Sequence, residues 1–288
     1  SIPLTCILAI ALSMFIGLRP LHGFGDSSNY IEYYNLLELT KFSFKYDTEN
    51  IIWDNFFAWW ASSNLGIRRF FLFVATCYYT LTLVACRKIF PKNFSISYIV
   101  FLGAFSTFSY SVNGIKAGLA STIFILAWAY RHKFLLCILL MFTSWGIHHS
   151  MQLPVIAFII TLFYKNTKSY FFIWLACIVL AFAHVDFFAN FFASITDESG
   201  SKYLMGGSED GTKGGFRLDF ILYSSAPIFI GFLAIFKKKI KVSEQYKQVL
   251  NLYLCTNSVW MLCMYANFTN RIAYLSWFLY PFVLIYPL

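Results

Sequence analysis

Apolar runs close to the length of a membrane span recur along this whole sequence. The hydrocarbon core of a bilayer is about 30 Å thick and requires about 20 apolar residues of helix, with a range of about 17–25. Charged residues make up only 12% of the 288 positions, whereas a water-soluble domain carries about 25%. The chain is therefore predicted to be an all-α polytopic membrane protein with about ten transmembrane helices. The predicted spans are residues 2–18, 66–86, 94–111, 114–130, 134–148, 150–164, 170–192, 218–236, 247–266 and 271–288.

The loops between these spans, counted together with the adjoining span ends, divide sharply by charge. On one side they hold twelve Lys or Arg residues and a single acid, Glu244. The loops on the other side hold the remaining ten basic residues and the remaining twelve acids. Because Lys and Arg near span ends concentrate in the cytoplasm, the first side is predicted to be cytoplasmic. This sidedness accounts for the net charge of +9 without a nucleic-acid partner.

The whole chain, 1–288, is predicted to be one integral domain with two large outer loops, at 19–65 and 193–217. Residues 53–60 of the first loop read Trp-Asp-Asn-Phe-Phe-Ala-Trp-Trp, which predicts an aromatic helix lying on the membrane surface. The second loop contains six glycines and is predicted to be a mobile lid over bound substrate.

Four cations stand at the outer ends of predicted spans: Arg19, Lys116, Arg217 and Arg271. Any one of them is equally well explained by contact with lipid headgroups. Four cations on helices far apart in the sequence instead indicate an anion site. Lys and Arg bind phosphate by charge, and Arg adds bidentate hydrogen bonds.

His148 interrupts the otherwise apolar stretch 134–164. Fourteen residues of helix cover about 21 Å, so His148 is expected below the outer membrane surface, at the floor of a water-filled dip. Lys116 is expected at a similar depth, and ionisable groups there indicate function. A neutral imidazole suits a general base near neutral pH, and a helix-end histidine bonded to the backbone is the structural alternative. His149 would point about 100° away on a helix.

Three further features have mainly structural explanations. Asp26 either caps the helix that carries Tyr30 or binds a sugar hydroxyl or an arginine. Gly114 and Gly118 form a motif typical of close helix packing. The seven cysteines lie in or beside apolar runs without a C-x-x-C pair, and no His or carboxylate stands three or four residues from His148. Neither a disulfide framework nor a metal site is predicted.

Five stretches, in this order, resemble the EpsG/Wzy-type polysaccharide polymerases of bacteria. The chain departs from the family pattern at Lys116-Ala117, where the family usually has Arg-Gln, so the cation is kept but its bidentate geometry is lost. The stretches are Arg19 through Asp26 with Tyr30, Asn113-Gly114-Ile115-Lys116-Ala117-Gly118-Leu119-Ala120, His148-His149-Ser150, Gly215-Phe216-Arg217-Leu218-Asp219-Phe220 and Asn270-Arg271-Ile272-Ala273-Tyr274.

The resemblance implies an inner-membrane enzyme with a glycosyltransferase-C-like helical fold and an outward-facing active site. It would transfer a glycan chain from undecaprenyl pyrophosphate onto another lipid-linked oligosaccharide, for O-antigen, capsule or exopolysaccharide. No cofactor is implied, and the expected partners are this substrate, membrane lipids and other polysaccharide export proteins. The implied catalytic residues are His148, Arg217 and Asp26, and the implied substrate-binding residues are Arg19, Lys116, Arg271, Tyr30 and Asp219.

Two other functions remain open from the sequence. A membrane acyltransferase acting on surface sugars would need an acyl-CoA entry from the cytoplasm, and the inward loops show no polar cluster suited to one. A flippase or transporter for lipid-linked sugars often shows two related halves and helices broken at mid-membrane, and the sequence shows no internal repeat. Both observations favour the polymerase.

Overall fold

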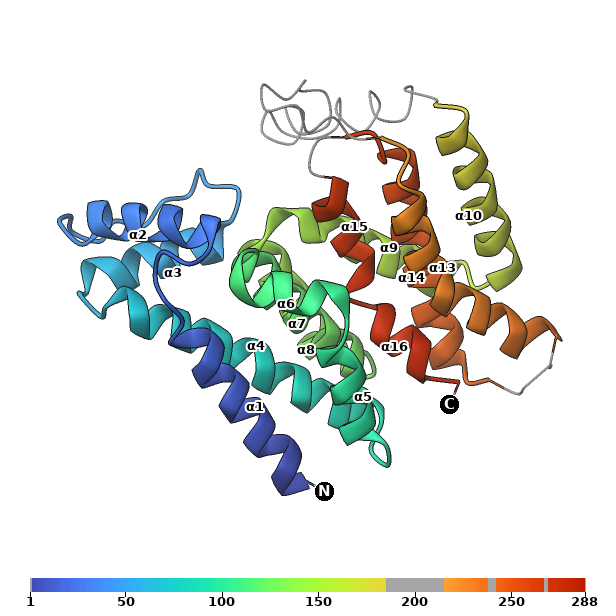
Figure 1. Ribbon diagram of the computed structural model, residues 1–288, viewed down its shortest axis with the longest axis horizontal. Helices are drawn as coiled ribbons and strands as arrows, with labels where there is room; N and C mark the ends of the chain where they lie inside the picture. Colours follow the sequence, from blue (N-terminus) through green and yellow to red (C-terminus); the bar gives the residue numbers. More distant parts are fainter. Residues whose placement is uncertain (1, 185–214, 238–241, 267–268, 288) are drawn as a thin grey trace. The chain divides into compact units, whose positions relative to one another are not determined.

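The computed structural model describes residues 2–184, 215–237, 242–266 and 269–287, and every regular element in this part of the chain is a helix (Figure 1). The predicted all-α class is confirmed. The chain divides into two compact units, residues 1–152 and 153–288. The predicted lid at 193–217 lies outside the described residues except for 215–217.

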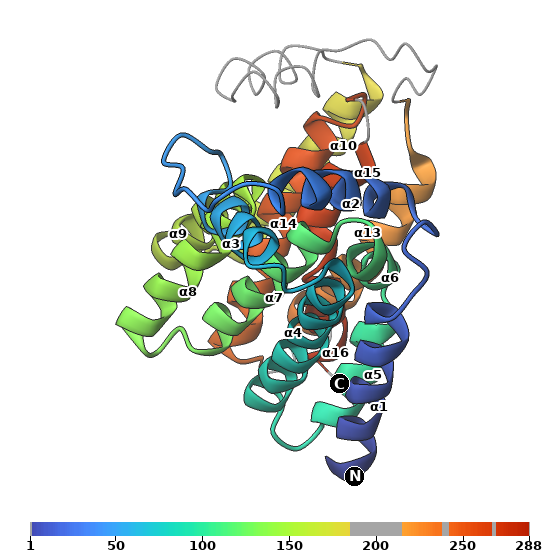
Figure 2. The same cartoon turned by 90° about the vertical axis from the view of Figure 1, so that its left-hand side faces the viewer.

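The first unit is built around α4, which has α1 and α7 beside it (Figure 2). Gly17 lets α1 approach closely, since a Cβ there would lie 2.6 Å from the Cα of Leu72 on α4. Buried hydroxyls join α4 to α7, with 3.2 Å between Oγ1 of Thr82 and Oγ1 of Thr122. The helices are α1 (Ile2–Gly17), α2 (Gly25–Leu37), α3 (Ile51–Ser62), α4 (Ile67–Ile89), α5 (Phe94–Leu102), α6 (Phe105–Val112), α7 (Ile115–Ala129), α8 (Phe134–Ile147) and the short 3₁₀ helix η1 (His149–Met151).

The second unit has a buried polar network at its centre. The amide of Asn257 accepts from Trp174 Nε1 at 2.8 Å and donates to the hydroxyls of Ser276 at 2.9 Å and Ser224 at 3.2 Å. Such a satisfied network fixes the packing of four helices around it. The helices are α9 (Gln152–Phe163), whose first residue closes the first unit, α10 (Thr167–Phe182), α13 (Leu218–Phe232), the π-helical turn η2 (Leu233–Lys237), α14 (Glu244–Leu262), α15 (Thr269–Trp277) and α16 (Tyr280–Ile285).

Two predicted spans are broken. The span predicted at 94–111 is two helices, α5 and α6, bent by 69°. Ala104 is extended at the bend, and the Thr107 hydroxyl donates to the Phe101 carbonyl at 2.6 Å, which satisfies a backbone acceptor near the break. The span predicted at 271–288 is divided into α15 and α16, with Pro281 in the first turn of α16. Proline fits a first helical turn but cannot donate a backbone hydrogen bond to continue a preceding helix.

Within the described ranges, α4 and α13 extended through η2 are long and apolar enough to cross a membrane. The bent α5–α6 pair passes the same test as one unit, and α1, α7, α8, α9 and α10 are shorter apolar helices. These helices are those of a membrane protein, while the count of ten spans stays a prediction.

The predicted close-packing role of the Gly114–Gly118 motif is confirmed, and α6 is the segment it packs against. A Cβ on Gly118 would lie 2.5 Å from the carbonyl oxygen of Tyr110 on α6, so α6 and α7 could not keep their separation. We expect Gly118→Ala to destabilise the protein by about 1–3 kcal/mol, the usual cost of overpacking. A thermal unfolding curve in detergent measures this loss.

Gly103 provides the matched control, because a Cβ there would have its nearest neighbours at 3.7 Å. Gly103→Ala should leave the unfolding midpoint unchanged. Equal midpoints for the Gly118 and Gly103 variants would show that the α6–α7 contact can relax and that the close approach is unimportant.

Candidate functional site

Three of the predicted motifs meet at one end of the first unit. Helices α7 and α8 are consecutive and lie side by side, so the start of α7 and the end of α8 are at the same end. The hydroxyl of Ser144 donates to the carbonyl of Ala120 at 2.6 Å and fixes this pairing one turn from Lys116 and from His148. Arg19 reaches the same region, because its Nη2 donates to the carbonyl of Val112, the last residue of α6, at 2.9 Å.

Arg19 is a buried cation, 6% exposed. Its guanidinium donates to the carbonyls of Ile16 and Val112 at 3.0 and 2.9 Å and to the Ser27 hydroxyl at 3.1 Å. It also lies 4.6 Å from the centre of the Phe71 ring. Burial lowers the pKa of Arg19, but a guanidinium remains charged at any physiological pH. These contacts hold the ends of α1 and α6 to the start of α2.

Asp26 and Tyr30 both lie on α2, directly after Arg19. Helix α2 begins at Gly25, its N-cap is Phe24, and Asp26 stands in the first turn. The alternative in which Asp26 caps this helix is therefore wrong. The half-buried Tyr30 ring packs edge-on against the aromatic residues Trp53, Phe57 and Phe71 at 5.9–6.3 Å.

His148 ends α8 in an extended conformation, with φ −142° and ψ 112°. Its Nδ1 lies 2.5 Å from the hydroxyl of Ser150, so the His-x-Ser pair suggested by the resemblance forms directly. The expectation of two histidines about 100° apart on one helix is wrong, because the chain leaves α8 at His148 and His149 opens η1. The backbone N–H of His149 donates to the side-chain oxygen of Asn50 at 2.8 Å.

Asp54 is a member of this cluster that the sequence reasoning missed. It lies on α3, and its backbone N–H donates to the carbonyl of Asn50, the residue that holds His149. Burial raises the pKa of Asp54, and the positive charge of Lys116 opposes this shift. Glu49 is a second carboxylate that acts electrostatically on Lys116. Lys116 is therefore a half-buried cation under the influence of two carboxylates, one on α3 and one just before it, at the same end of the α7–α8 pair as His148 and Ser150.

Asp54 gives a test of whether this cluster is kept for function. Because folding raises the pKa of Asp54, the folded state favours the neutral carboxyl. The free energy of unfolding therefore falls as the pH rises from the usual Asp pKa of about 3.9 through the raised pKa of the folded state. Asp54→Asn mimics the neutral form. We expect this variant to have a higher thermal midpoint than the unsubstituted protein at pH 7, with the difference vanishing at acidic pH.

The same variant should lose activity, because it removes a negative charge that acts on Lys116. Thermal unfolding at several pH values and an activity assay at matched protein level are the two measurements. A lower midpoint at pH 7, or full activity, would remove Asp54 from the site.

The second unit holds the other predicted residues, Arg217, Asp219 and Arg271. Arg217 directly precedes α13, and its Nε and Nη2 donate to the two carboxylate oxygens of Asp219 at 2.9 and 2.7 Å. This hydrogen bonding raises the pKa of Arg217, and the guanidinium also lies 3.6 Å from the centre of the Phe220 ring. The side chains of Arg217 and Asp219 are 37% and 62% exposed. The arginine fork is thus held in the bidentate geometry that also suits phosphate.

Arg271 is exposed in the first turn of α15. The start of that helix is anchored to α14, because Trp260 Nε1 donates to the hydroxyl of Thr269 at 2.9 Å. In the part of the chain that the structure describes, no group of three or more His, Cys, Asp or Glu side chains is arranged to hold a metal ion.

Comparison with known proteins adds one finding. The family model described as the EpsG family matches residues 3–288. Neither the curated proteins nor the solved structures gave a match to the chain. The family match spans both compact units and includes every residue assigned above.

Proposed function

Because this chain belongs to the EpsG family, which makes it a membrane protein of the polysaccharide-polymerase type, we propose that it polymerises lipid-linked oligosaccharide repeat units. The donor is a glycan chain on undecaprenyl pyrophosphate, and the acceptor is the terminal sugar of another lipid-linked unit. A new glycosidic bond forms at the anomeric carbon of the donor while the bond to pyrophosphate breaks. Undecaprenyl pyrophosphate leaves, and the acceptor hydroxyl gives up its proton.

The observation that carries this proposal is the His148–Ser150 pair at the same end of the α7–α8 pair as Lys116. If Nδ1–H of His148 donates to the Ser150 hydroxyl, Nε2 keeps a lone pair that can take the acceptor proton. Lys116 offers a positive charge one helix away for a phosphate group. In the second unit, Arg217 makes a two-pronged contact with the Asp219 carboxylate, and the same geometry would suit a pyrophosphate. Asp26 and Tyr30 would bind sugar hydroxyls, and Arg271 would add a further cation.

The number of spans, the fold type and the orientation in the membrane belong to the same proposal. Ten spans with a glycosyltransferase-C-like arrangement would place residues 19–65 and 193–217 outside the bacterial inner membrane. The charge distribution of the loops supports this orientation. A site on the outer face needs only substrates that are already attached to lipid.

Reconstitution of the purified protein with a lipid-linked repeat unit tests the reaction. A ladder of products that differ by one repeat is expected. Movement of the repeat unit across vesicle membranes without a ladder would indicate the flippase, and consumption of acyl-CoA would indicate the acyltransferase. Either of these results in place of a ladder would overturn the polymerase assignment.

A further inference from the structure

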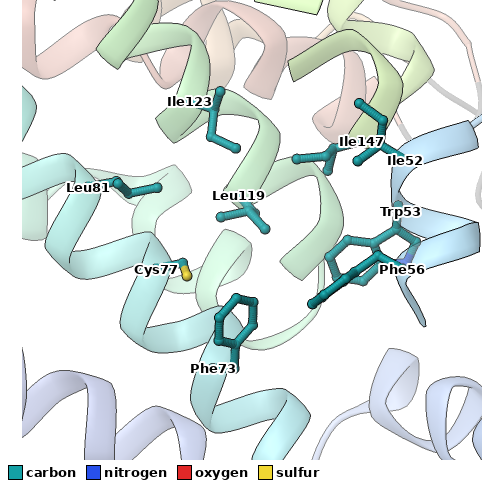
Figure 3. Close-up of a pocket in the computed structure, with 9 residues that line it drawn as sticks. All are labelled: Ile52, Trp53, Phe56, Phe73, Cys77, Leu81, Leu119, Ile123 and Ile147. Carbon is teal, nitrogen blue, oxygen red and sulfur yellow. The ribbon is translucent and has the colours of Figure 1, made fainter. Parts of the chain in front are cut away.

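An apolar groove runs through the first unit beside the polar cluster, which comprises Lys116, His148, Ser150 and Asp54. It has a volume of about 220 Å³ and is formed by α3, α4, α7 and α8 (Figure 3). Only apolar and aromatic residues line it, and Figure 3 shows their side chains gathered around one space, among them Trp53, Phe56, Phe73, Cys77, Leu119 and Ile147.

The wall of the groove on α4 belongs to a helix long enough to cross a membrane. Phe73 and Cys77 are four residues apart and therefore lie on one face of that helix. Phe73 is 40% exposed, so the groove is open at the surface of α4. In a bilayer the medium outside this surface is hydrocarbon, and an apolar groove there admits a lipid chain.

Three separate helices lead from the groove to the polar cluster. Leu119 lies one turn beyond Lys116 on α7, Ile147 immediately precedes His148, and Trp53 immediately precedes Asp54. A hydrocarbon chain in the groove would thus have its headgroup near the cation of Lys116, the imidazole of His148 and the carboxyl of Asp54, which already acts on Lys116. The ligand that matches this arrangement has an apolar tail and an anionic head.

We propose that this groove binds the first part of the polyprenyl chain of the lipid-linked substrate and thereby places its pyrophosphate next to Lys116. The inference rests on the proposed function for the identity of the lipid. Lipid tails are as apolar as the groove, so transfer from the bilayer gains little from the hydrophobic effect. The benefit is orientation of the reacting group, for which a small displacement can cost about 100-fold in rate.

Photo-crosslinking of the full chain in nanodiscs tests this placement. The probe is undecaprenyl pyrophosphate with a diazirine in the chain segment nearest the pyrophosphate. We expect adducts on Phe73, Cys77 and Leu119, and we expect an excess of phosphatidylglycerol not to prevent them. The proposal would be overturned if the adducts were spread over the lipid-facing surfaces of other apolar helices, or if excess phosphatidylglycerol prevented them. Either result would show ordinary lipid contact.

Filling the groove gives a second readout. Leu119→Trp should lower the groove adducts and reduce kcat/KM for the lipid-linked donor about 10- to 100-fold. Phe73→Trp, at a partly exposed position that accommodates a larger ring, should act in the same direction and covers the case in which Leu119→Trp does not fold. The matched control is Leu139→Trp on α8, because Leu139 is 60% exposed and lies outside the groove.

The two proposals fail in different ways. Groove adducts without any product ladder would keep the lipid site and reject the polymerase. A product ladder with adducts elsewhere, or with full kcat/KM in both groove-filling variants, would keep the polymerase and reject the lipid site.

Discussion

Replacing His148 with alanine is expected to abolish polymerisation while the protein still folds and inserts. The backbone of His148 is extended at the end of α8, and its side chain is only half-buried. Loss of the side chain therefore leaves the helix packing in place. General-base catalysis typically contributes about 100- to 10,000-fold in rate. A loss of this size leaves no measurable ladder when the variant and the unsubstituted protein are compared at equal amounts.

His149→Ala is the matched control, because the structural contact of His149 to Asn50 uses its backbone N–H, which alanine retains. This variant should keep partial activity. Ser150→Ala should fall between the two, since it removes the hydroxyl that contacts Nδ1 of His148 and orients the imidazole. Equal and mild losses in the His148 and His149 variants would exclude the general-base role.

Arg217→Ala is expected to lower the rate of chain growth about 100- to 1000-fold, the usual cost of removing one donor that stabilises a developing negative charge. As the glycosidic bond breaks, charge grows on the departing pyrophosphate, and a fixed donor there favours the transition state over the ground state. Arg217 immediately precedes the first turn of α13, where the partial positive charge of the helix N-terminus also favours an anion.

Arg217→Lys separates this role from simple anchoring. Lysine keeps the charge but cannot form the two-pronged contact that Arg217 makes with Asp219, so only a small residual rate is expected. If Arg217 merely anchored α13 among lipid headgroups, lysine would replace it fully. Asp219→Asn should raise KM for the donor more than it lowers kcat, because it loosens the orientation of the fork. Full polymer length and rate in Arg217→Lys would contradict the assignment.

Most helix positions could be predicted because the apolar runs are long and bounded by charge or glycine. The run predicted at 66–86 is α4, and the run predicted at 134–148 is α8. The break between α5 and α6 could not be predicted, since it depends on tertiary contacts such as that of the Tyr78 hydroxyl with the carbonyl of Thr107 at 3.5 Å. The break before α16 carries a local signal, Pro281, which cannot donate the backbone hydrogen bond that would continue a preceding helix.

The candidate site was only partly predictable for a similar reason. The His148–Ser150 pair is local, so its geometry follows from a short motif. The partner of Arg19 on α6, Val112, is 93 residues away in sequence, and no local pattern predicts that this arginine is buried against α6. Asp54 could not be predicted as a site residue because it lies within an aromatic run, and its interaction with Lys116 arises only when α3 folds against α8.

The stoichiometry of the purified reaction tests the central claim most directly. A lipid-linked repeat unit labelled in its polyprenyl chain is incubated with the reconstituted protein, and free undecaprenyl pyrophosphate and new glycosidic linkages are counted together. The proposed transfer predicts one undecaprenyl pyrophosphate released for each linkage formed, and neither product in His148→Ala. Release of undecaprenyl pyrophosphate without linkages, or linkages without release, would contradict it.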